Sequence, residues 1–381
     1  MIKLINRKII YTCLLLFILT GCREPYFPEI DKYENLLVID GLITDREGPH
    51  LVRITRSYSF DESYPESEQF AVVAILDEDG GMENLTEERP GHYYTSAGYR
   101  GEIGKAYQLV VSTSDNEQYE SEWVILSRVP EIDSVTHRFV ERATTDPHES
   151  HYGMEVRVNT HDETNQTRYY RWEWTETWEI ITPIKSSFYP DEERCWRSNR
   201  SSLIAIGTSE HLTDDVIEDH PLYFISTENN RLRIKYSALI SQYSMSREAY
   251  SYWKSLQEIT QNTGTLFDPT PAAVTGNIYH SMDQEKPVLG IFQASAVSEQ
   301  RIFIDRDELP NFLDIPSGYA ACEFFATADS AEKAYYLDHH YYLVDIYMDG
   351  DLEYYLFCNA EYCYRCTLSG TNIQPDYWPD N

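Results

Sequence analysis

The chain has 381 residues, of which 63 are acidic and 31 are Lys or Arg, giving a formal net charge of −32 at pH 7 with histidine neutral. This acidic excess argues against nucleic acid or an anionic lipid surface as the main partner. It is spread along the chain, which favours an ordinary solvated surface over an acidic face for a cationic ligand or metal ion. The length allows two or three domains.

The N-terminal segment 1–21 has the pattern of a bacterial lipoprotein signal peptide. Lys3, Arg7 and Lys8 precede the apolar run Ile9–Leu19, which is about half the length needed to span a bilayer. The run ends in Leu19-Thr20-Gly21-Cys22, a lipobox that predicts cleavage after Gly21 and lipid attachment at Cys22. The alternatives are an ordinary secretory signal or a short membrane anchor.

The predicted mature protein begins with a lipid anchor and a tether. Loss of the segment 1–21 removes three basic and no acidic groups, which changes the formal net charge from −32 to −35. Stable anchoring takes about two acyl chains, which a diacylglyceryl cysteine supplies. Residues 22–32 contain two prolines among charged residues and predict a short tether. No later stretch approaches a transmembrane helix.

Short strands separated by turn residues predict an N-terminal all-β domain over residues 33–129. Their spacing is typical of a β-sandwich with immunoglobulin-like architecture. Val129-Pro130-Glu131 marks the expected boundary with the next domain. The expected strands are Leu36–Ile39, Leu51–Ile54, Phe70–Leu76, Ala106–Ser112 and Tyr119–Leu126.

Residues 130–381 predict a larger β-rich domain, in which one long strand has a pronounced alternation. One parity is apolar and aromatic, at Tyr170, Trp172, Trp174, Trp178 and Ile180. The other parity is polar, at Arg171, Glu173, Thr175 and Glu179. We therefore expect one face in a core and one face in water. The alternative for the tryptophans is an exposed platform that stacks on sugars.

The same domain contains further strands and one expected helix. Met154, Val156 and Val158 alternate with polar residues, and strands are also expected over Leu232–Tyr236, Val288–Ala294 and Arg301–Asp305. Over Ser244–Gln261, apolar residues recur at helical spacing and predict an amphipathic helix packed on the sheet. The expected fold is thus mainly β, with one amphipathic helix and a Cys-rich tail.

Several segments, in this order, carry a resemblance to a known family. They are 38–44 (VIDGLIT), 241–250 (SQYSMSREAY), 263–269 (TGTLFDP), 276–278 (GNI), 288–292 (VLGIF), 363–366 (CYRC) and 370–378 (GTNIQPDYW). The chain resembles the Bacteroidota lipoproteins of domain of unknown function 4249. This resemblance implies an outer-membrane lipoprotein of a group often encoded beside TonB-dependent receptors. No enzymatic activity is established for that family, so it transfers no catalytic residue.

Five cysteines remain after Cys13 in the signal peptide and the lipidated Cys22. They are Cys195, Cys322, Cys358, Cys363 and Cys366. Outside the cytoplasm disulfides are the default, so we expect bridges that tie the C-terminal tail to the body and leave one thiol unpaired. The alternative is a metal site at the CxxC pair, which lacks a second such pair or a well-spaced histidine.

Other motifs carry little chemistry. His148-Glu149-Ser150-His151 is one residue short of the zinc-protease spacing and is expected in a loop. Asp345, Asp349 and Asp351 around Gly350 fit a solvated hairpin turn better than a calcium loop. Asp133-Ser134-Val135 and Asp329-Ser330-Ala331 match a short bacterial O-glycosylation sequon.

No catalytic set emerges, so the sequence favours a non-catalytic binding or accessory lipoprotein. We expect it at the outer membrane, surface-exposed rather than periplasmic, acting with a TonB-dependent receptor in nutrient capture. No cofactor, metal or nucleic acid is expected, and the ligand is not specified. The alternatives are a surface hydrolase of peptides or glycans, and a structural or adhesive surface protein.

Overall fold

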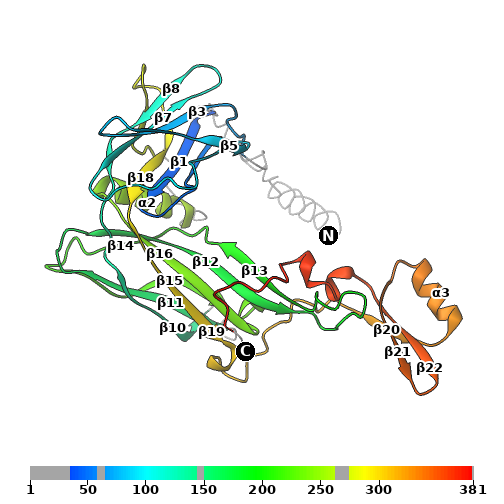
Figure 1. Cartoon of the computed structure of the whole chain (residues 1–381). Helices are drawn as coiled ribbons and strands as arrows, with labels where there is room; N and C mark the ends of the chain where they lie inside the picture. The colour runs from blue at the N-terminus through cyan, green and yellow to red at the C-terminus, as the bar shows by residue number, and fades with distance from the viewer. Residues whose placement is uncertain (1–34, 58–64, 144–149, 262–273, 380–381) are drawn as a thin grey trace, which may run out of the picture.

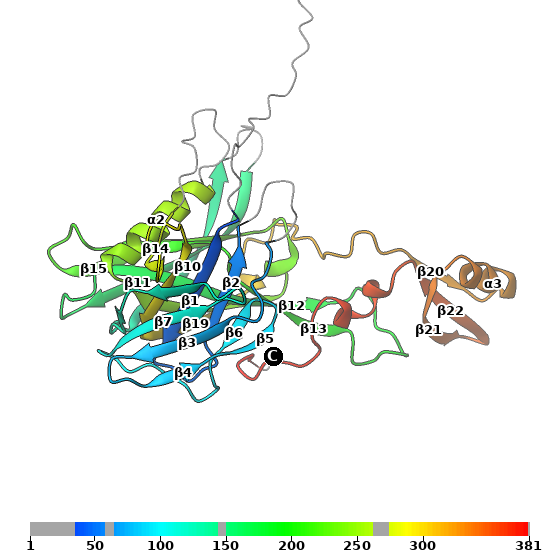
Figure 2. The same ribbon diagram turned by 90° about the horizontal axis from the view of Figure 1, so that it is seen from above.

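The computed structural model describes residues 35–57, 65–143, 150–261 and 274–379. The predicted signal peptide, Cys22 and the tether lie outside these residues, as do His148 and Glu149. The described chain is mainly β, as predicted, and forms three parts (Figure 1). An N-terminal sandwich and a central sandwich lie side by side, and an arm extends from the central sandwich (Figure 2). No described helix is long and apolar enough to cross a bilayer.

The N-terminal sandwich consists of two sheets around one core, to which both sheets contribute buried residues such as Ile39, Ile54, Ile75 and Leu109. The first sheet has the order β18 (Leu289–Ser295), β1 (Leu37–Thr44), β2 (Leu51–Arg56), β6 (His92–Tyr94) and β5 (Thr86–Arg89). The second has β17 (Ile278–His280), β8 (Gln118–Ser121), β7 (Ala106–Ser112), β3 (Val72–Asp77) and β4 (Met82–Asn84), with β9 (Val124–Ile125) on β7.

The expected N-terminal strands are confirmed, but the sandwich is not made from residues 33–129 alone. Strand β18 pairs in parallel with β1, from Val38 opposite Leu289 to Thr44 opposite Ser295. Gly290 has φ +106°, and a Cβ there would lie 1.8 Å from the Ile39 carbonyl oxygen, so the strand fits only with glycine. The expected boundary near Pro130 therefore does not separate two independent packing units. Residues 278–295 lie after it in the sequence but belong to the N-terminal core.

The central sandwich pairs a three-stranded sheet with a larger one. The first has the order β10 (Ile132–Ala143), β11 (Ser150–Asp162) and β15 (Asp215–Ser226). The second, here called the large sheet, has β13 (Arg194–Arg200), β12 (Tyr169–Ile181), β16 (Lys235–Ser244) and β19 (Val297–Asp305), with β14 (Ala205–Thr208) also on β12. The strand expected over Leu232–Tyr236 begins later, at Lys235 of β16, because residues 230–232 form a short 3-10 helix.

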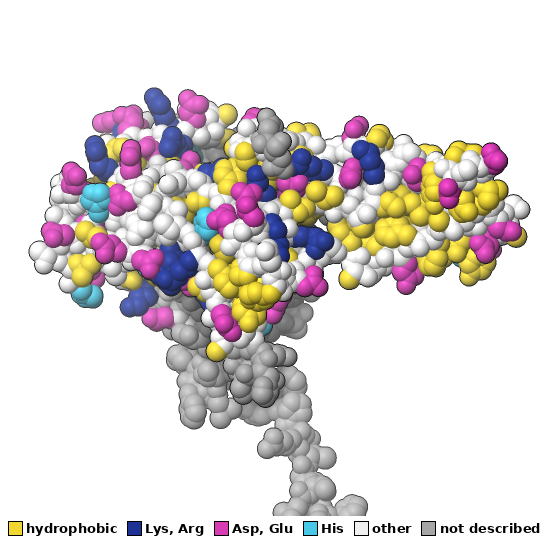
Figure 3. Space-filling view, turned by 90° about the horizontal axis from the view of Figure 1, so that it is seen from below, with side chains coloured by type: hydrophobic (Ala, Val, Ile, Leu, Met, Phe, Trp, Pro, Cys, Tyr) yellow, Lys and Arg dark blue, Asp and Glu magenta, His cyan; other side chains and the backbone are white. Residues whose placement is uncertain are grey.

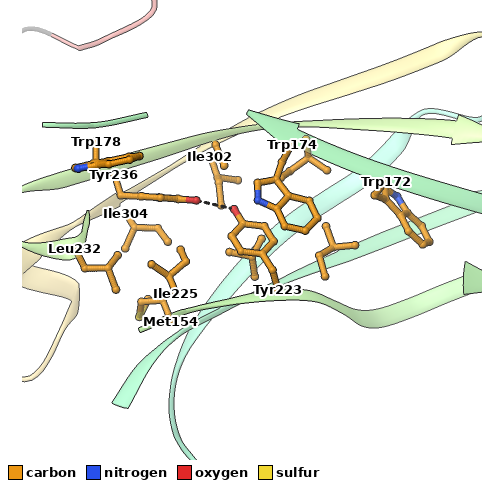
Figure 4. Close-up of a cluster of buried hydrophobic side chains, with 14 of the residues drawn as sticks. Met154, Trp172, Trp174, Trp178, Tyr223, Ile225, Leu232, Tyr236, Ile302 and Ile304 are labelled. Atoms are coloured by element: carbon orange, nitrogen blue, oxygen red, sulfur yellow. Dashed lines mark hydrogen bonds between the residues drawn. The ribbon is translucent and has the colours of Figure 1, made fainter. Parts of the chain in front are cut away.

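The tryptophans of β12 are core residues, as predicted, and not a sugar platform (Figure 4). Trp174 stacks on Tyr223 with ring centroids 4.1 Å apart, and the Tyr223 hydroxyl lies 3.1 Å from that of Tyr236. Glu176 shares this apolar face and is 5% exposed. Its carboxylate is satisfied by Arg231 Nη1 at 2.9 Å and by the Tyr236 hydroxyl at 3.0 Å, as a buried charge requires.

The predicted amphipathic helix is α2 (Arg247–Gln261), which begins three residues later than expected because β16 extends to Ser244. It packs Ala249, Tyr250 and Trp253 against Tyr169 and Ile291, at the junction of the two sandwiches. Tyr169 lies on β12 and Ile291 on β18, so the helix contacts strands of both units. Its apolar stripe is therefore covered by protein.

The arm has a second helix that we did not predict. Its sheet has the order β20 (Phe324–Thr327), β22 (Leu352–Cys358) and β21 (Tyr342–Asp349), and α3 (Ser330–Asp338) packs beside it. Asp329 caps α3 by accepting hydrogen bonds from the backbone N–H groups of Ala331 and Glu332. The Asp-Ser-Ala-Glu sequence at 329–332 is a recognisable helix start, although the apolar spacing that follows is weak.

Two disulfides hold the arm, as the cysteine count predicted. Cys195 of β13 is bonded to Cys366, and Cys322 is bonded to Cys363 within the arm. The two cysteines of the CxxC pair thus have different partners, which removes the thiols that a metal site there would need. Cys358 is the free cysteine among the described residues and is buried. Burial raises the pKa of its thiol, so it remains protonated and unreactive.

Replacing both Cys195 and Cys366 with Ser is expected to lower the free energy of unfolding by about 2–4 kcal/mol, because the bridge joins positions 171 residues apart in the sequence. Urea unfolding of the full chain measures the change. Cys358→Ala is the matched control, since it removes a buried sulfur but leaves both bridges. Equal stability of the double variant and the control would contradict the assignment.

Candidate functional site

A cavity of about 800 Å³ lies between the N-terminal sandwich and the large sheet. Its volume is within the range of small-molecule binding sites. Strands β1, β2, β5 and β6 supply one wall, and β12, β13, β16 and β19 supply the opposite wall with α2 beside it. Residues on both sides of the expected domain boundary are therefore brought together here.

Strand alternation explains which side chains face the cavity. In β1, Ile39 and Ile43 point into the N-terminal core, whereas Asp40 and Leu42 point to the opposite face and line the cavity. In β12 the tryptophans occupy the central core, so Arg171 and Glu173 project outward into the cavity. The polar face of β12 was expected in water, but Arg171 is only 6% exposed.

Arg171 is the most constrained polar residue of the cavity wall. Its guanidinium lies over the Trp253 ring of α2 at 4.3 Å and near the Tyr243 ring at 5.5 Å. Its Nη2 donates to Glu173 Oε1 at 2.8 Å. Its Nε is buried and has no hydrogen-bond partner. An unpartnered buried donor costs about 1–3 kcal/mol, so the side chain is not arranged for stability alone.

Charged residues from both walls surround Arg171. Glu173 Oε2 accepts from Arg200 Nη2 at 2.5 Å, and Asp40 Oδ2 lies 3.3 Å from Arg53 Nη2. Burial opposes ionisation of Glu173, but Arg171 and Arg200 hold its pKa below the ordinary value. Burial dominates at Asp40, whose pKa is raised despite the neighbouring arginines.

His50 closes the N-terminal end of the cavity. Its backbone N–H donates to Thr95 Oγ1 at 2.9 Å, and its ring makes an edge contact with Tyr99. Nε2 is buried without a hydrogen-bond partner, and the residue is 8% exposed. Burial lowers the pKa of His50, so the ring is neutral at pH 7.

The cavity has the lining of a site for a polar ligand, with charged side chains beside the aromatic rings of Tyr94, Tyr243 and Trp253. Two of its carboxylates, Asp40 and Glu173, are paired with arginines, and its one histidine contacts Thr95 and Tyr99. In the described part of the chain, no group of three or more His, Cys, Asp or Glu residues is placed to hold a metal ion. The arrangement can therefore orient a polar ligand.

A second candidate surface lies on the arm, where exposed apolar side chains gather (Figure 3). These residues, here called the arm patch, lie on α3, β21 and the start of β22. They are Tyr335, Leu337, Tyr342, Ile346, Tyr347, Met348 and Leu352, all at least 39% exposed. Strand alternation places Ile346 and Met348 on one face of the β21–β22 hairpin and Tyr347 and Leu352 on the other. Exposed apolar surface of this extent marks interaction sites in folded proteins.

The other residues singled out from the sequence lie apart from the cavity. Asp349 and Asp351 flank Gly350 in the β21–β22 hairpin turn, as predicted, with Asp345 farther back on β21. His151 is at the start of β11 rather than in a loop, and its Nδ1 lies 2.5 Å from Glu228 Oε1. In the sequons, Ser134 is on β10, where its hydroxyl accepts from Asn159, and Ser330 begins α3.

Sequence reasoning missed most residues of the cavity. Arg53 belongs to a predicted strand and Asp40 directly follows one, but the alternation of these strands gave no sign that the outer face of the sheet is covered. Arg171 and Glu173 could have been singled out from the sequence, because they lie on the face of β12 opposite the tryptophans. Such a face is either exposed to solvent or covered by another part of the protein. The pattern does not distinguish these two cases.

Comparison with known families identifies the relatives of the chain. Residues 23–301 match the family described as Domain of unknown function (DUF4249). The chain belongs to this family. A search among curated proteins finds no match. The DUF4249 match contains both walls of the cavity and ends within β19, so the arm and the C-terminal tail follow it. Residues 363–378, where part of the resemblance was seen, are therefore beyond the matched range.

Replacing His50 with Gln is expected to reduce the loss of stability on acidification. The pKa of His50 in the folded protein is below the ordinary 6.5, so the unfolded chain binds this proton more readily. The free energy of unfolding therefore falls as the pH drops through about 6.5, and urea unfolding at pH 7.5 and 5.5 measures it.

The variant should retain part of the pH dependence, because burial also lowers the pKa of His220. His211→Gln is the matched control, since His211 is exposed and lies outside the cavity. A pH dependence in His50→Gln as steep as in the unmodified chain would contradict the account of His50.

Proposed function

We propose that this protein is a Bacteroidota lipoprotein anchored in the outer membrane, where it acts as a non-catalytic binding or accessory component of a TonB-dependent receptor in nutrient capture. The lipobox at Cys22 and the resemblance to outer-membrane lipoproteins support the anchor and the partner. Membership of DUF4249 is consistent with this role. The structural observation that carries the proposal is the arm patch.

The arm exposes apolar side chains on both faces of its hairpin and on α3. Met348 is 62% exposed, Leu352 57%, Tyr335 54% and Leu337 53%. Tyr347 and Tyr354 stack across the β21–β22 hairpin, and Tyr335 stacks on His339 after α3, so these rings are held in fixed positions. Rigid aromatic rings supply contact area at a low entropic cost, which suits a partner interface.

The position and charge of the arm indicate the kind of partner. The arm projects from the body, so its patch is accessible to a large neighbour (Figure 1). Acidic residues lie on the same elements as the patch or in the turn between β21 and β22, namely Asp338, Asp345, Asp349, Asp351 and Glu353. Complementarity then calls for a partner surface with an apolar centre and a basic rim. We assign this role to the TonB-dependent receptor.

Cys22→Ala is expected to release the protein from the membrane. The substitution removes the thiol that would carry the acyl chains, and no described helix replaces them as a membrane anchor. Fractionation of cells, with the unmodified chain recovered in the outer membrane, measures the shift to the soluble fraction. Retention of Cys22→Ala in the outer membrane would contradict lipid anchoring at this residue.

Replacing Met348 and Leu352 together with Ser is expected to abolish co-purification with a barrel receptor from detergent-solubilised membranes. Both side chains are exposed, so the change should leave folding intact and affect only partner binding. Leu212→Ser is the matched control, because Leu212 is 55% exposed but lies on the central sandwich. Recovery of the unmodified chain without any barrel partner would refute the proposed role.

A further inference from the structure

We infer that the cavity between the two sandwiches binds a small organic carboxylate, with Arg171 and Arg200 holding the carboxylate group beside the Trp253 ring. This site is separate from the arm patch. It can therefore exist whether or not the protein works with a receptor, and it goes beyond the proposed accessory role by giving the protein a ligand of its own.

The first support is the charge of the cavity compared with that of the whole chain. Five arginines line it, namely Arg46, Arg53, Arg89, Arg171 and Arg200. Four carboxylates do so as well, namely Asp40, Glu47, Glu173 and Glu299. The lining thus has a formal charge of +1 with histidine neutral, although the chain carries −32. A positive concave surface within an acidic protein concentrates anions at that point.

The second support is the number of hydrogen-bond donors that the cavity leaves available. Among the described residues, Arg46 and Arg89 form no ion pair, and Arg89 donates only to the Tyr94 hydroxyl. Arg200 is paired through Nη2 with Glu173, yet its side chain remains 66% exposed. Arg171 Nε and His50 Nε2 are both buried in the wall without a partner. An acceptor entering the cavity would find accessible donors on Arg46, Arg89 and Arg200.

The third support is the way in which Arg171 is held. The indole of Trp253 covers one face of the guanidinium, and the Trp253 Nε1 is fixed by a hydrogen bond to Gln293 Oε1 at 2.8 Å. Glu173 binds one edge of the same guanidinium. A guanidinium fixed in plane is preorganised for a carboxylate, which it binds through paired N–H groups.

The magnitude of the charge favours a carboxylate over a phosphate. A phosphate monoester carries about −1.5 to −2 at pH 7, which exceeds the single positive charge of the lining. A carboxylate carries −1 and balances it. The rings of Trp253, Tyr243 and Tyr94, together with Leu42, are available to contact the carbon skeleton. The free C-terminus of a short peptide and an acidic sugar both have this chemistry.

Isothermal titration of the full chain in a non-ionic detergent tests the site. The probes are N-acetyl-Ala-Phe with a free carboxylate, the same dipeptide as its C-terminal amide, glucuronate and inorganic phosphate. We expect at least one carboxylate to bind at least tenfold more tightly than phosphate. If the dipeptide is that ligand, its amide should bind at least tenfold more weakly, and preference for the dipeptide or glucuronate identifies the source of the carboxylate.

Arg200→Gln and Arg171→Gln are each expected to weaken carboxylate binding at least tenfold. Arg200 is exposed, so its variant keeps the test valid if the more buried Arg171 variant fails to fold. Arg128→Gln is the matched control, since Arg128 does not line the cavity. Equal binding of dipeptide and amide, tighter binding of phosphate, no binding of either carboxylate, or unchanged binding in Arg200→Gln would each overturn the assignment. None of these results depends on the arm or a receptor.

Discussion

The relation between the two sandwiches depends on one uninterrupted run of chain. Only Ala296 separates β18, which belongs to the N-terminal sandwich, from β19, which belongs to the large sheet. Its backbone N–H donates to the Ser127 carbonyl, and the Val297 N–H donates to Asp45 Oδ1. So short a connection, held on both sides, leaves no hinge there. The walls of the cavity are consequently fixed, which suits a preformed binding site.

Buried polar groups next to this connection reinforce the junction. Ser295 Oγ accepts from the Ser244 N–H, and Gln242 binds Trp172, Thr160 and the Pro130 carbonyl through its side-chain amide. The chain thus passes between the sandwiches at Pro130 and again at Ala296, and hydrogen bonds at both places are satisfied. A fully satisfied network of this kind specifies a single geometry.

Local pattern was sufficient to predict the elements of the fold but not their partners. The period-two alternation of β12 correctly predicted which side holds the tryptophans, because it depends only on neighbouring residues. The burial of Arg171, on the opposite side of β12, depends on β1 and on Trp253 of α2, both of which are distant from it in the sequence. Cysteine spacing likewise predicted bridges without revealing that Cys363 and Cys366 have different partners. The burial of Glu176 was not predicted, because a charged residue is not expected in a core. It is possible here only because Arg231 pairs with its carboxylate.

The parallel pairing of β1 and β18 also sets the order in which the protein can fold as the chain is synthesised. When the chain has emerged only as far as Pro130, β1 is paired with β2 on one side, and its other edge is open. An open strand edge is a site of mispairing with other chains. That edge is closed only when residues 289–295 arrive, so the N-terminal sandwich is completed after most of the central sandwich has emerged. The family match over residues 23–301 includes both β1 and β18. The matched region therefore contains the whole segment that must be present before the N-terminal sandwich can be completed.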